Sequence, residues 1–321
     1  MARKLRIESA GAIYHVLNRG NYRGDVFAHR GARQAFLQCL EEACRKTGWI
    51  LHAWAVMRNH YHLALETPAP NLVDGMGWLQ TTFCARFNRY RSENGHVFQG
   101  RYKALPVARG PSLGALCHYI HLNPVAAEAT PMSRLRDWPW GSFRALQHPA
   151  ARPAWFNPRA ALTEPCALDD TDAGRRSYAE YLAWLATDEV EKKRLGFDRM
   201  ATDWALGPKE FKEALLQEAR HRGASLPYGS SEMKEARELD WAVQLARLRA
   251  QLPTGADSPR GKSADWKVAL ATVMKDRTTA SNPWLAGHLL MGAPSMLSRL
   301  AAECRASLRA VSLYRLLSSI R

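Results

Sequence analysis

Hydrophobic and polar positions in the first third of the chain follow two periods in turn, one typical of strands and one typical of helices. Residues 12–17 alternate and are rich in β-forming side chains, so they predict a strand. A helical pattern follows over residues 30–46. Residues 49–56 predict a second strand, and the polar pair Arg58-Asn59 predicts a hairpin turn into a third strand that begins at His60.

The same succession of periods continues to about residue 123. Residues 71–91 predict a helix, and residues 95–107 predict one or two further strands. Residues 111–123 predict another helix, which Pro124 is expected to stop. Strand, helix, hairpin, helix, strand and helix in this order predict an α+β fold of the ferredoxin-like kind, with helices on the face of an antiparallel sheet.

The second half of the chain has a different pattern. Residues 149–165 are rich in Pro and Ala and predict a linker. Beyond them the apolar positions recur at helical spacing to the end, with a Pro- and Gly-containing break over residues 252–259. We therefore expect three parts, which are a first domain at residues 1–148, a linker and helical connector at residues 149–257, and an all-α module at residues 258–321.

Charge is distributed unevenly over these parts. The chain has 45 Lys and Arg against 30 Asp and Glu, a net charge of +15. Residues 1–150 carry +10, residues 151–257 carry −2 and residues 258–321 carry +7. Such an excess points to a polyanionic partner, nucleic acid first and an anionic membrane surface second. Two basic ends around a near-neutral middle indicate two modules that face nucleic acid.

Three features favour a cytoplasmic protein. No apolar run approaches the ~20 residues that a membrane helix needs, and the basic start has no apolar stretch after it, unlike a signal peptide. The 6 cysteines are scattered without a CxxC pair, which fits buried reduced thiols better than disulfides or a zinc site.

The third predicted strand carries two histidines that can act together. His60 and His62 are two positions apart, so in a strand their imidazoles lie on one face, about 6 to 7 Å from each other. Two imidazoles at that spacing can share one divalent metal ion. The alternative is that they are ordinary half-exposed histidines on the surface of a sheet.

The helix predicted at residues 111–123 offers a second pair. Tyr119 and Asn123 are four residues apart, so a phenol and an amide oxygen lie one turn apart on one helix face. Together with the histidines they form a mixed nitrogen and oxygen set of the kind that suits Mg²⁺ or Mn²⁺ held jointly with substrate oxygens. The alternative for Tyr119 is a packed aromatic ring with its hydroxyl in a hydrogen bond.

These motifs resemble a known family. His60-Tyr61-His62 looks like the HUH motif, and five motifs in order resemble the REP-associated tyrosine transposases, relatives of the single-tyrosine HUH transposases with an IS200-like domain. The motifs are Asn18–Asn21, Met57–Leu63, Phe98–Lys103, Tyr119–Val125 and Trp138–Ser142. The resemblance covers residues 12–146.

The resemblance implies a metal-dependent endonuclease and strand transferase that acts on single-stranded DNA at REP-type palindromic hairpins. His60, His62 and Asn123 would hold Mg²⁺ or Mn²⁺ on the scissile phosphate. Tyr119 would attack phosphorus and leave a 5′-phosphotyrosine and a free 3′-hydroxyl. A phenol with an ordinary pKa near 10 is a poor nucleophile at neutral pH, and the sequence names no clear base; His121 is a candidate only.

Basic and aromatic side chains near these motifs are candidate DNA contacts. We expect phosphate contacts from Arg19, Arg23, Arg101 and Lys103, and base stacking on Tyr22 and Phe98. Residues 284–300 predict a helix-turn-helix whose second helix presents Ser295, Ser298 and Arg299 to a DNA duplex. The alternative is a helical hairpin with no role in DNA binding.

Two other functions compete with the nuclease. The chain could be a non-catalytic, sequence-specific DNA-binding regulator on the same fold, but such a protein needs neither the histidine pair nor Tyr119 and Asn123. A histidine-triad nucleotide hydrolase would have a third histidine at position 64, which is Ala64. We expect a cytoplasmic, nucleoid-associated monomer or homodimer that binds DNA and no membrane.

Overall fold

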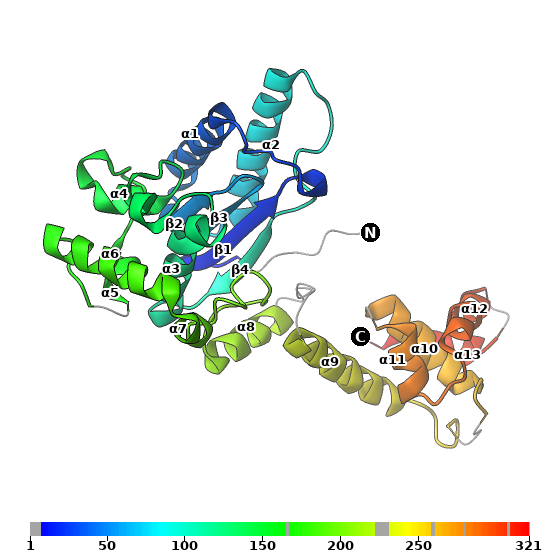
Figure 1. Ribbon diagram of the computed structural model, residues 1–321. Coiled ribbons are helices and arrows are strands. Elements are labelled where there is room, and N and C mark those ends of the chain that lie inside the picture. The colour runs from blue at the N-terminus through cyan, green and yellow to red at the C-terminus, as the bar shows by residue number, and fades with distance from the viewer. Residues whose placement is uncertain are drawn as a thin grey trace. The chain divides into compact units, whose positions relative to one another are not determined.

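The computed structural model describes residues 8–164, 167–221, 231–257, 261–278, 280–306 and 309–320. Contacts divide the chain into two units, Met1–Gly229 and Ser230–Arg321. Figure 1 shows a sheet with helices in the first unit and helices in the second. Among the described residues, none of the helices is long and apolar enough to cross a membrane.

The first unit is built on one antiparallel sheet of four strands in the order β2-β3-β1-β4. The strands are β1 (Ala12–Arg19), β2 (Ile50–Val56), β3 (His60–Thr67) and β4 (Lys103–Val107). The hairpin between β2 and β3 turns at Arg58-Asn59, where two polar residues interrupt the apolar run, as predicted. With α1 (Arg30–Thr47) and α2 (Leu72–Arg91), the elements follow the predicted β-α-β-β-α-β order.

An aromatic cluster joins the sheet to α1 and α2. Tyr61 of β3 points away from its neighbours His60 and His62 and packs against Phe36 of α1, with ring centroids 4.6 Å apart. Phe83 of α2 packs on Phe36 at 5.4 Å, and all three side chains are fully buried. Because successive residues of a strand face opposite sides, this packing leaves the histidines of β3 on the other face of the sheet.

The other face is covered by α3 (Pro111–Ala126), which contacts β2 and β3 (Figure 1). The prediction that Pro124 stops this helix is wrong, because Pro124 lies within its last turn. Proline lacks an N–H and costs a helix one hydrogen bond, but the next turn still closes through the bond from the Ala127 amide to the Asn123 carbonyl. The side chain of Pro124 is buried, so packing offsets part of that loss.

The stretch predicted as a linker, residues 149–165, is packed into the first unit as far as it is described; Pro165 lies outside the described residues. The Leu51 amide of β2 donates to the Trp155 carbonyl, and the Asn157 amide donates to the Leu51 carbonyl. Phe156 lies against Trp54 with ring centroids 5.0 Å apart. Contacts therefore divide the chain at residue 229, whereas the sequence predicted boundaries after residues 148 and 257.

Short helices complete the first unit. They are α4 (Ser142–Gln147), α5 (Arg159–Thr163), α6 (Asp172–Thr187), α7 (Glu189–Arg194) and α8 (Lys209–His221), with 3₁₀ turns at Asn21–Arg23, Met132–Asp137 and Pro149–Ala151. Tyr178, Leu182 and Leu185 of α6 are fully buried in the same core as the sheet.

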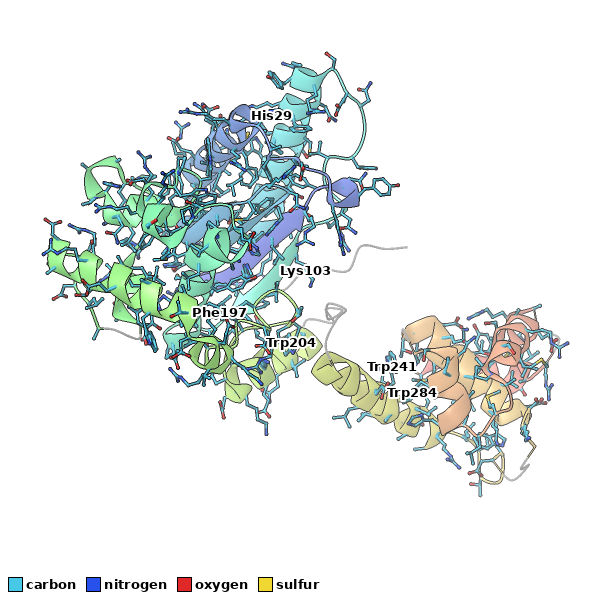
Figure 2. The ribbon with its side chains drawn as sticks, in the orientation of Figure 1. His29, Lys103, Phe197, Trp204, Trp241 and Trp284 are labelled. Carbon is cyan, nitrogen blue, oxygen red and sulfur yellow. The ribbon has the colours of Figure 1, made fainter. Side chains whose placement is uncertain are left out.

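The second unit is all-helical, as predicted. Its helices are α9 (Ser231–Arg249), α10 (Asp265–Arg277), α11 (Asn282–His288), α12 (Pro294–Arg305) and α13 (Val311–Ser319). Helix α10 is buried over residues 266–274 and contacts α9, α12 and α13. Trp241 of α9 and Trp284 of α11 pack edge to face at 5.3 Å (Figure 2). Ser281 caps α11, and Pro294 is the first residue of α12.

Candidate active site

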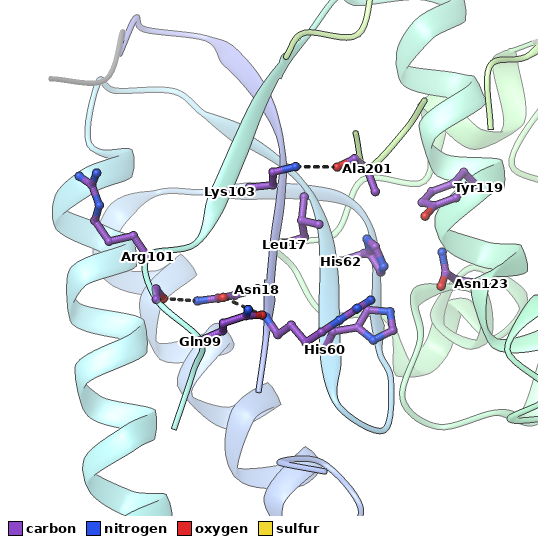
Figure 3. A pocket seen from close by; sticks show the side chains of 12 residues that line it. Leu17, Asn18, His60, His62, Gln99, Arg101, Lys103, Tyr119, Asn123 and Ala201 are labelled. Atoms are coloured by element: carbon purple, nitrogen blue, oxygen red, sulfur yellow. Dashed lines mark hydrogen bonds between the residues drawn. The ribbon is translucent and has the colours of Figure 1, made fainter. Parts of the chain in front are cut away.

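A cavity of about 480 Å³ opens where β1, β3, β4 and α3 meet (Figure 3). Its walls are formed by Leu17, Asn18, Arg19, His60, His62, Gln99, Gly100, Arg101, Lys103, Tyr119, Asn123 and Ala201. The cavity thus brings together the four residues predicted from the sequence as metal ligands and nucleophile, along with three of the predicted phosphate contacts.

Strand β3 places the two histidines side by side. His60 and His62 pair with Arg19 and Leu17 of β1, and their ring centroids are 4.9 Å apart. The intervening Tyr61 faces the opposite side of the sheet, where it packs on Phe36. The common face that the two-residue period predicts is therefore the face that lines the cavity.

Helix α3 brings the other pair to the same cavity. The Tyr119 ring stands edge-on to the His62 ring at 5.6 Å between centroids. The Asn123 side chain, one turn further along, lines the same cavity and partly offsets the effect of burial on the pKa of both His60 and Tyr119. One amide group therefore acts on a predicted metal ligand and on the predicted nucleophile.

A buried polar network on the opposite side of α3 fixes this helix in the fold. His118 and His121 each hydrogen-bond the Tyr178 hydroxyl of α6 at 2.9 Å. His121 also bonds the Ser142 hydroxyl at 2.8 Å, and Ser142 accepts the Trp54 amide of β2. His121 is thus fully engaged away from the cavity, and the prediction that it could be the base for Tyr119 is wrong.

Burial sets the charge of the site. It lowers the pKa of His60 to about 4, with help from the Arg19 charge, and it lowers the pKa of His62 well below its ordinary 6.5. Burial also raises the pKa of Tyr119, against the opposing effects of Asn123 and Arg19. At neutral pH the site therefore holds two neutral imidazoles and a protonated phenol.

The hydrogen bonds around His60 leave one of its ring nitrogens available for a metal ion. The Asn59 amide nitrogen donates to the Arg23 carbonyl, which turns its oxygen toward His60. That oxygen accepts from His60 Nδ1 at 2.7 Å, so the Nε2 lone pair of the neutral ring is left for a ligand. The described residues contain no group of three or more His, Cys, Asp and Glu side chains placed to hold a metal ion. A site here would need the Asn123 oxygen as its third donor from the protein.

The remaining residues that were predicted to contact DNA differ in where they lie relative to the cavity. Arg101 lines the cavity, and Lys103 lines it while donating to the Ala201 carbonyl at 3.0 Å (Figure 3). Tyr22 is 94% exposed on a turn with positive φ that it shares with Arg23. The prediction that Phe98 stacks on a base is wrong, because its ring is buried against Phe27, Phe83 and Tyr61.

In the second unit, Ser295 and Arg299 are exposed on α12, and Arg299 lies 3.5 Å from Glu303 one turn later. Ser298 is exposed on the same helix, and its hydroxyl accepts hydrogen bonds from Asn282 at 2.9 Å and Lys275 at 3.4 Å. Ser298 therefore ties α12 to α10 and α11.

Two contributors to the site were not predicted from the sequence. His15 of β1 is fully buried behind His62, and its Nε2 lies 2.9 Å from His62 Nδ1. The segment 195–206 lies beside the cavity, where the Phe197 ring, labelled in Figure 2, packs edge-on against Tyr119 at 5.5 Å between ring centroids. An alternating strand pattern marks His15 as inward-facing, but nothing in the pattern pairs it with a residue far along the chain.

Comparison with known proteins agrees with this geometry. Residues 9–123 match the family model described as "Transposase IS200 like". The resemblance to IS200-like transposases is confirmed over this segment. The match begins before β1 and ends at Asn123, so it spans the sheet and the part of α3 that lines the cavity.

Two solved structures are similar at a low level. One is described as the REP-associated tyrosine transposase bound to a REP hairpin, with 17% identity, a TM-score of 0.39, and coverage of 49% of this chain and 92% of that chain. The other is a putative transposase from Deinococcus radiodurans, with 23% identity, a TM-score of 0.27, and coverage of 34% and 88%. No curated protein matches the chain.

Proposed function

We propose that the first unit is a ferredoxin-like HUH nuclease domain that cleaves and rejoins single-stranded DNA. The observation that carries this proposal is the convergence of His60, His62, Tyr119 and Asn123 on one cavity, inside the segment that matches IS200-like transposases. A protein that only bound DNA would have no use for a phenol placed beside two neutral imidazoles. The sequence-specific regulator is therefore the weaker alternative.

The chemistry follows from the groups in the cavity. The Tyr119 oxygen attacks the scissile phosphorus, a new bond between that oxygen and phosphorus forms, and the bond from phosphorus to the DNA 3′-oxygen breaks. The phenol loses its proton and the departing 3′-oxygen gains one, which leaves a 5′-phosphotyrosine and a 3′-hydroxyl. Attack of a 3′-hydroxyl on the phosphotyrosine reverses the step and joins strands.

The imidazoles and the Asn123 oxygen are the groups that would hold a divalent cation, with Mg²⁺ or Mn²⁺ suited to this donor set. Such an ion supplies stabilisation of the charge that develops on the phosphate oxygens. Asn123 lies one helical turn from Tyr119 on the same cavity wall, and its side chain opposes the effect of burial on the pKa of the phenol. Arg19 opposes the effect of burial on the pKa of Tyr119 and lies where it can contact the substrate phosphate.

The DNA is expected to approach along the basic rim of the cavity. Arg101 and Lys103 on one wall, and Arg23 on the neighbouring turn, are proposed to contact backbone phosphates. Tyr22 presents an exposed ring for base stacking.

The second unit is proposed to hold the duplex stem of a REP-type palindromic hairpin. Helices α11 and α12 would form a helix-turn-helix in which Ser295 and Arg299 face the major groove. Binding to chromosomal DNA would associate the protein with the nucleoid in the cytoplasm.

A direct test of this function uses a labelled single strand that contains a palindrome and a 3′ or 5′ extension. With Mn²⁺ or Mg²⁺, the protein should form a covalent adduct that survives denaturing electrophoresis, and a chelator should prevent it. The same sequence as a full duplex should give little adduct. Cleavage without any covalent species, or no reaction on any single strand, would count against the proposal.

A further inference from the structure

A chain of two hydrogen bonds runs behind the cavity and has no part in the chemistry described above. His15 Nδ1 lies 2.8 Å from the Met200 carbonyl oxygen, and His15 Nε2 lies 2.9 Å from His62 Nδ1. The two imidazole rings are stacked, with centroids 5.1 Å apart and an interplanar angle of 24°. His15 is fully buried and His62 nearly so.

The direction of both bonds follows from the chemistry of the acceptor. A carbonyl oxygen can only accept, so His15 Nδ1 carries the proton that is donated to Met200. His15 is fully buried, which disfavours a charged imidazole, and its Nδ1 already holds the single proton of the neutral ring, so its Nε2 is an acceptor. His62 must then donate from Nδ1, and the lone pair of its own Nε2 is left for the cavity.

We propose that His15 is a positioning residue that holds His62 in the tautomer and ring orientation needed to bind a metal ion through Nε2. The proposal deepens the proposed function and rests on it. His60 is held in the same way by the residue before it in the sequence, because the Asn59 side-chain oxygen accepts from its Nδ1. Each of the two imidazoles is therefore held at Nδ1 by a hydrogen-bond acceptor, which leaves its Nε2 for a metal ion.

We call the hydrogen-bonded chain from the Met200 carbonyl through His15 to His62 the relay. It also connects the site to a remote part of the chain. Met200 belongs to the segment 195–206, in which Phe197 packs on Tyr119 and the Ala201 carbonyl accepts from Lys103. The same segment is fixed to β4, since the Leu206 amide donates to the Pro106 carbonyl. The segment thus contacts the nucleophile directly and the metal-binding histidine through His15.

Substitution of His15 tests the relay in the full chain. His15→Phe keeps a planar ring but removes both hydrogen bonds, and we expect the dissociation constant for Mn²⁺ without DNA to rise by about 10- to 100-fold, the usual effect of losing such a partner. His15→Gln keeps one donor and one acceptor and should recover most of the affinity. His52→Phe is the matched control, because His52 is equally buried in the sheet but bonds Glu66. Its affinity for Mn²⁺ should equal that of the unaltered protein.

Isothermal titration calorimetry gives the Mn²⁺ affinities, and long-range ¹⁵N–¹H NMR spectra of the metal-free protein give the tautomer of His62 directly. The relay predicts His62 protonated at Nδ1 in the unaltered protein and a mixture of tautomers in His15→Phe. A His62 protonated at Nε2 in the unaltered protein, or equal Mn²⁺ affinity in His15→Phe and the unaltered protein, would overturn it. If His15→Phe does not fold, the tautomer of His62 in the unaltered protein and the Mn²⁺ affinity of His15→Gln test the proposal.

The two proposals fail in different ways. If His62 is protonated at Nδ1 but no Mn²⁺ binds, the relay stands and the proposed metal site is wrong. If Mn²⁺ binds equally well with and without His15, the metal site stands and the relay is wrong.

Discussion

At the scale of single residues, the site depends on histidines that stay neutral because they are buried. His15 and His118 have a pKa lowered to about 4, and His121 one lowered to about 3, all chiefly by burial. None of the three lines the cavity. They hold the sheet and α3 in place, so protonation of these groups acts on stability before it acts on chemistry.

This predicts that the first unit loses stability in mild acid. Between the folded pKa near 4 and the ordinary value of 6.5, the unfolded chain binds more protons than the folded one, so the free energy of unfolding falls as pH falls through that window. From pH 7 to pH 5 the loss should be roughly 2 kcal/mol for each such histidine. Hydrogen exchange measured by mass spectrometry at both pH values, corrected for the intrinsic exchange rate, reports this loss of stability for each peptide.

Peptides from the second unit serve as the internal control, because the only histidine in its sequence, His288, is exposed. Their stability should change little over the same range. Equal losses in the two units would show that the buried histidines are not responsible.

The Tyr178 hydroxyl is the second test at this scale. It is shared by His118 and His121, so Tyr178→Phe leaves two buried imidazole nitrogens without that partner. The free energy of unfolding should fall by about 1 to 3 kcal/mol. Urea titration measures the change. Tyr90→Phe, at a tyrosine that is 86% exposed, should leave the free energy of unfolding unchanged. If Tyr178→Phe also leaves it unchanged, the network contributes little to stability.

At the scale of elements, α2 contains two glycines whose surroundings differ. A Cβ at Gly75 would lie 2.1 Å from Cζ2 of the buried Trp49, whereas a Cβ at Gly77 would meet nothing within 4 Å. Trp49 cannot easily move, because its indole nitrogen donates to the Asn71 side chain at 2.8 Å. The helix therefore needs glycine at one of these positions and merely tolerates it at the other.

Matched alanine substitutions should have opposite effects. Gly75→Ala gains helix propensity but forces Trp49 out of place, for a net loss of about 1 to 3 kcal/mol in the free energy of unfolding. Gly77→Ala keeps the propensity gain, which is as much as ~1 kcal/mol. Thermal or urea unfolding compares the two proteins. Stabilisation by both substitutions would contradict the packing of Trp49 on α2.

The elements also show what a sequence can reveal about this molecule. The two-residue period put His60 and His62 on one face, and the helical period put Tyr119 and Asn123 on another; the fold brings these faces together. Phe98 was misjudged because sequence alone does not reveal that its loop covers the aromatic cluster. His15 was missed because its partner Met200 is 185 positions away, a distance that no local pattern spans.

The linker prediction shows the same limit. Pro and Ala at residues 149–165 are typical of an extended connection, yet the backbone around Trp155 pairs with β2. The hydrogen bonds that fix this segment belong to its main chain, which side-chain composition does not describe.

At the scale of the whole molecule, the proposed division of labour assigns the single strand to the first unit and the hairpin stem to the second. Arg299 tests the second assignment, because it is exposed in the middle of α12. Arg299→Ala should weaken binding of a hairpin, and the slope of log affinity against log salt should fall by about one. Fluorescence anisotropy at several salt concentrations measures both.

Arg315→Ala removes the same charge from an exposed position on α13, which is not the proposed recognition helix. It should bind the hairpin nearly as well as the unaltered protein. If both substitutions weaken binding equally, the second unit contributes general positive charge and α12 has no special role.

Tyr119 as the nucleophile of a DNA-cleaving site can be tested through the covalent adduct between the protein and a labelled single-stranded hairpin, formed with Mn²⁺ and identified by mass spectrometry of the modified peptide. We expect an adduct on Tyr119 in the unaltered protein, an equal yield in Tyr90→Phe, and none in Tyr119→Phe, which should still bind the DNA. An adduct of normal yield in Tyr119→Phe, or one located on another residue, would contradict it.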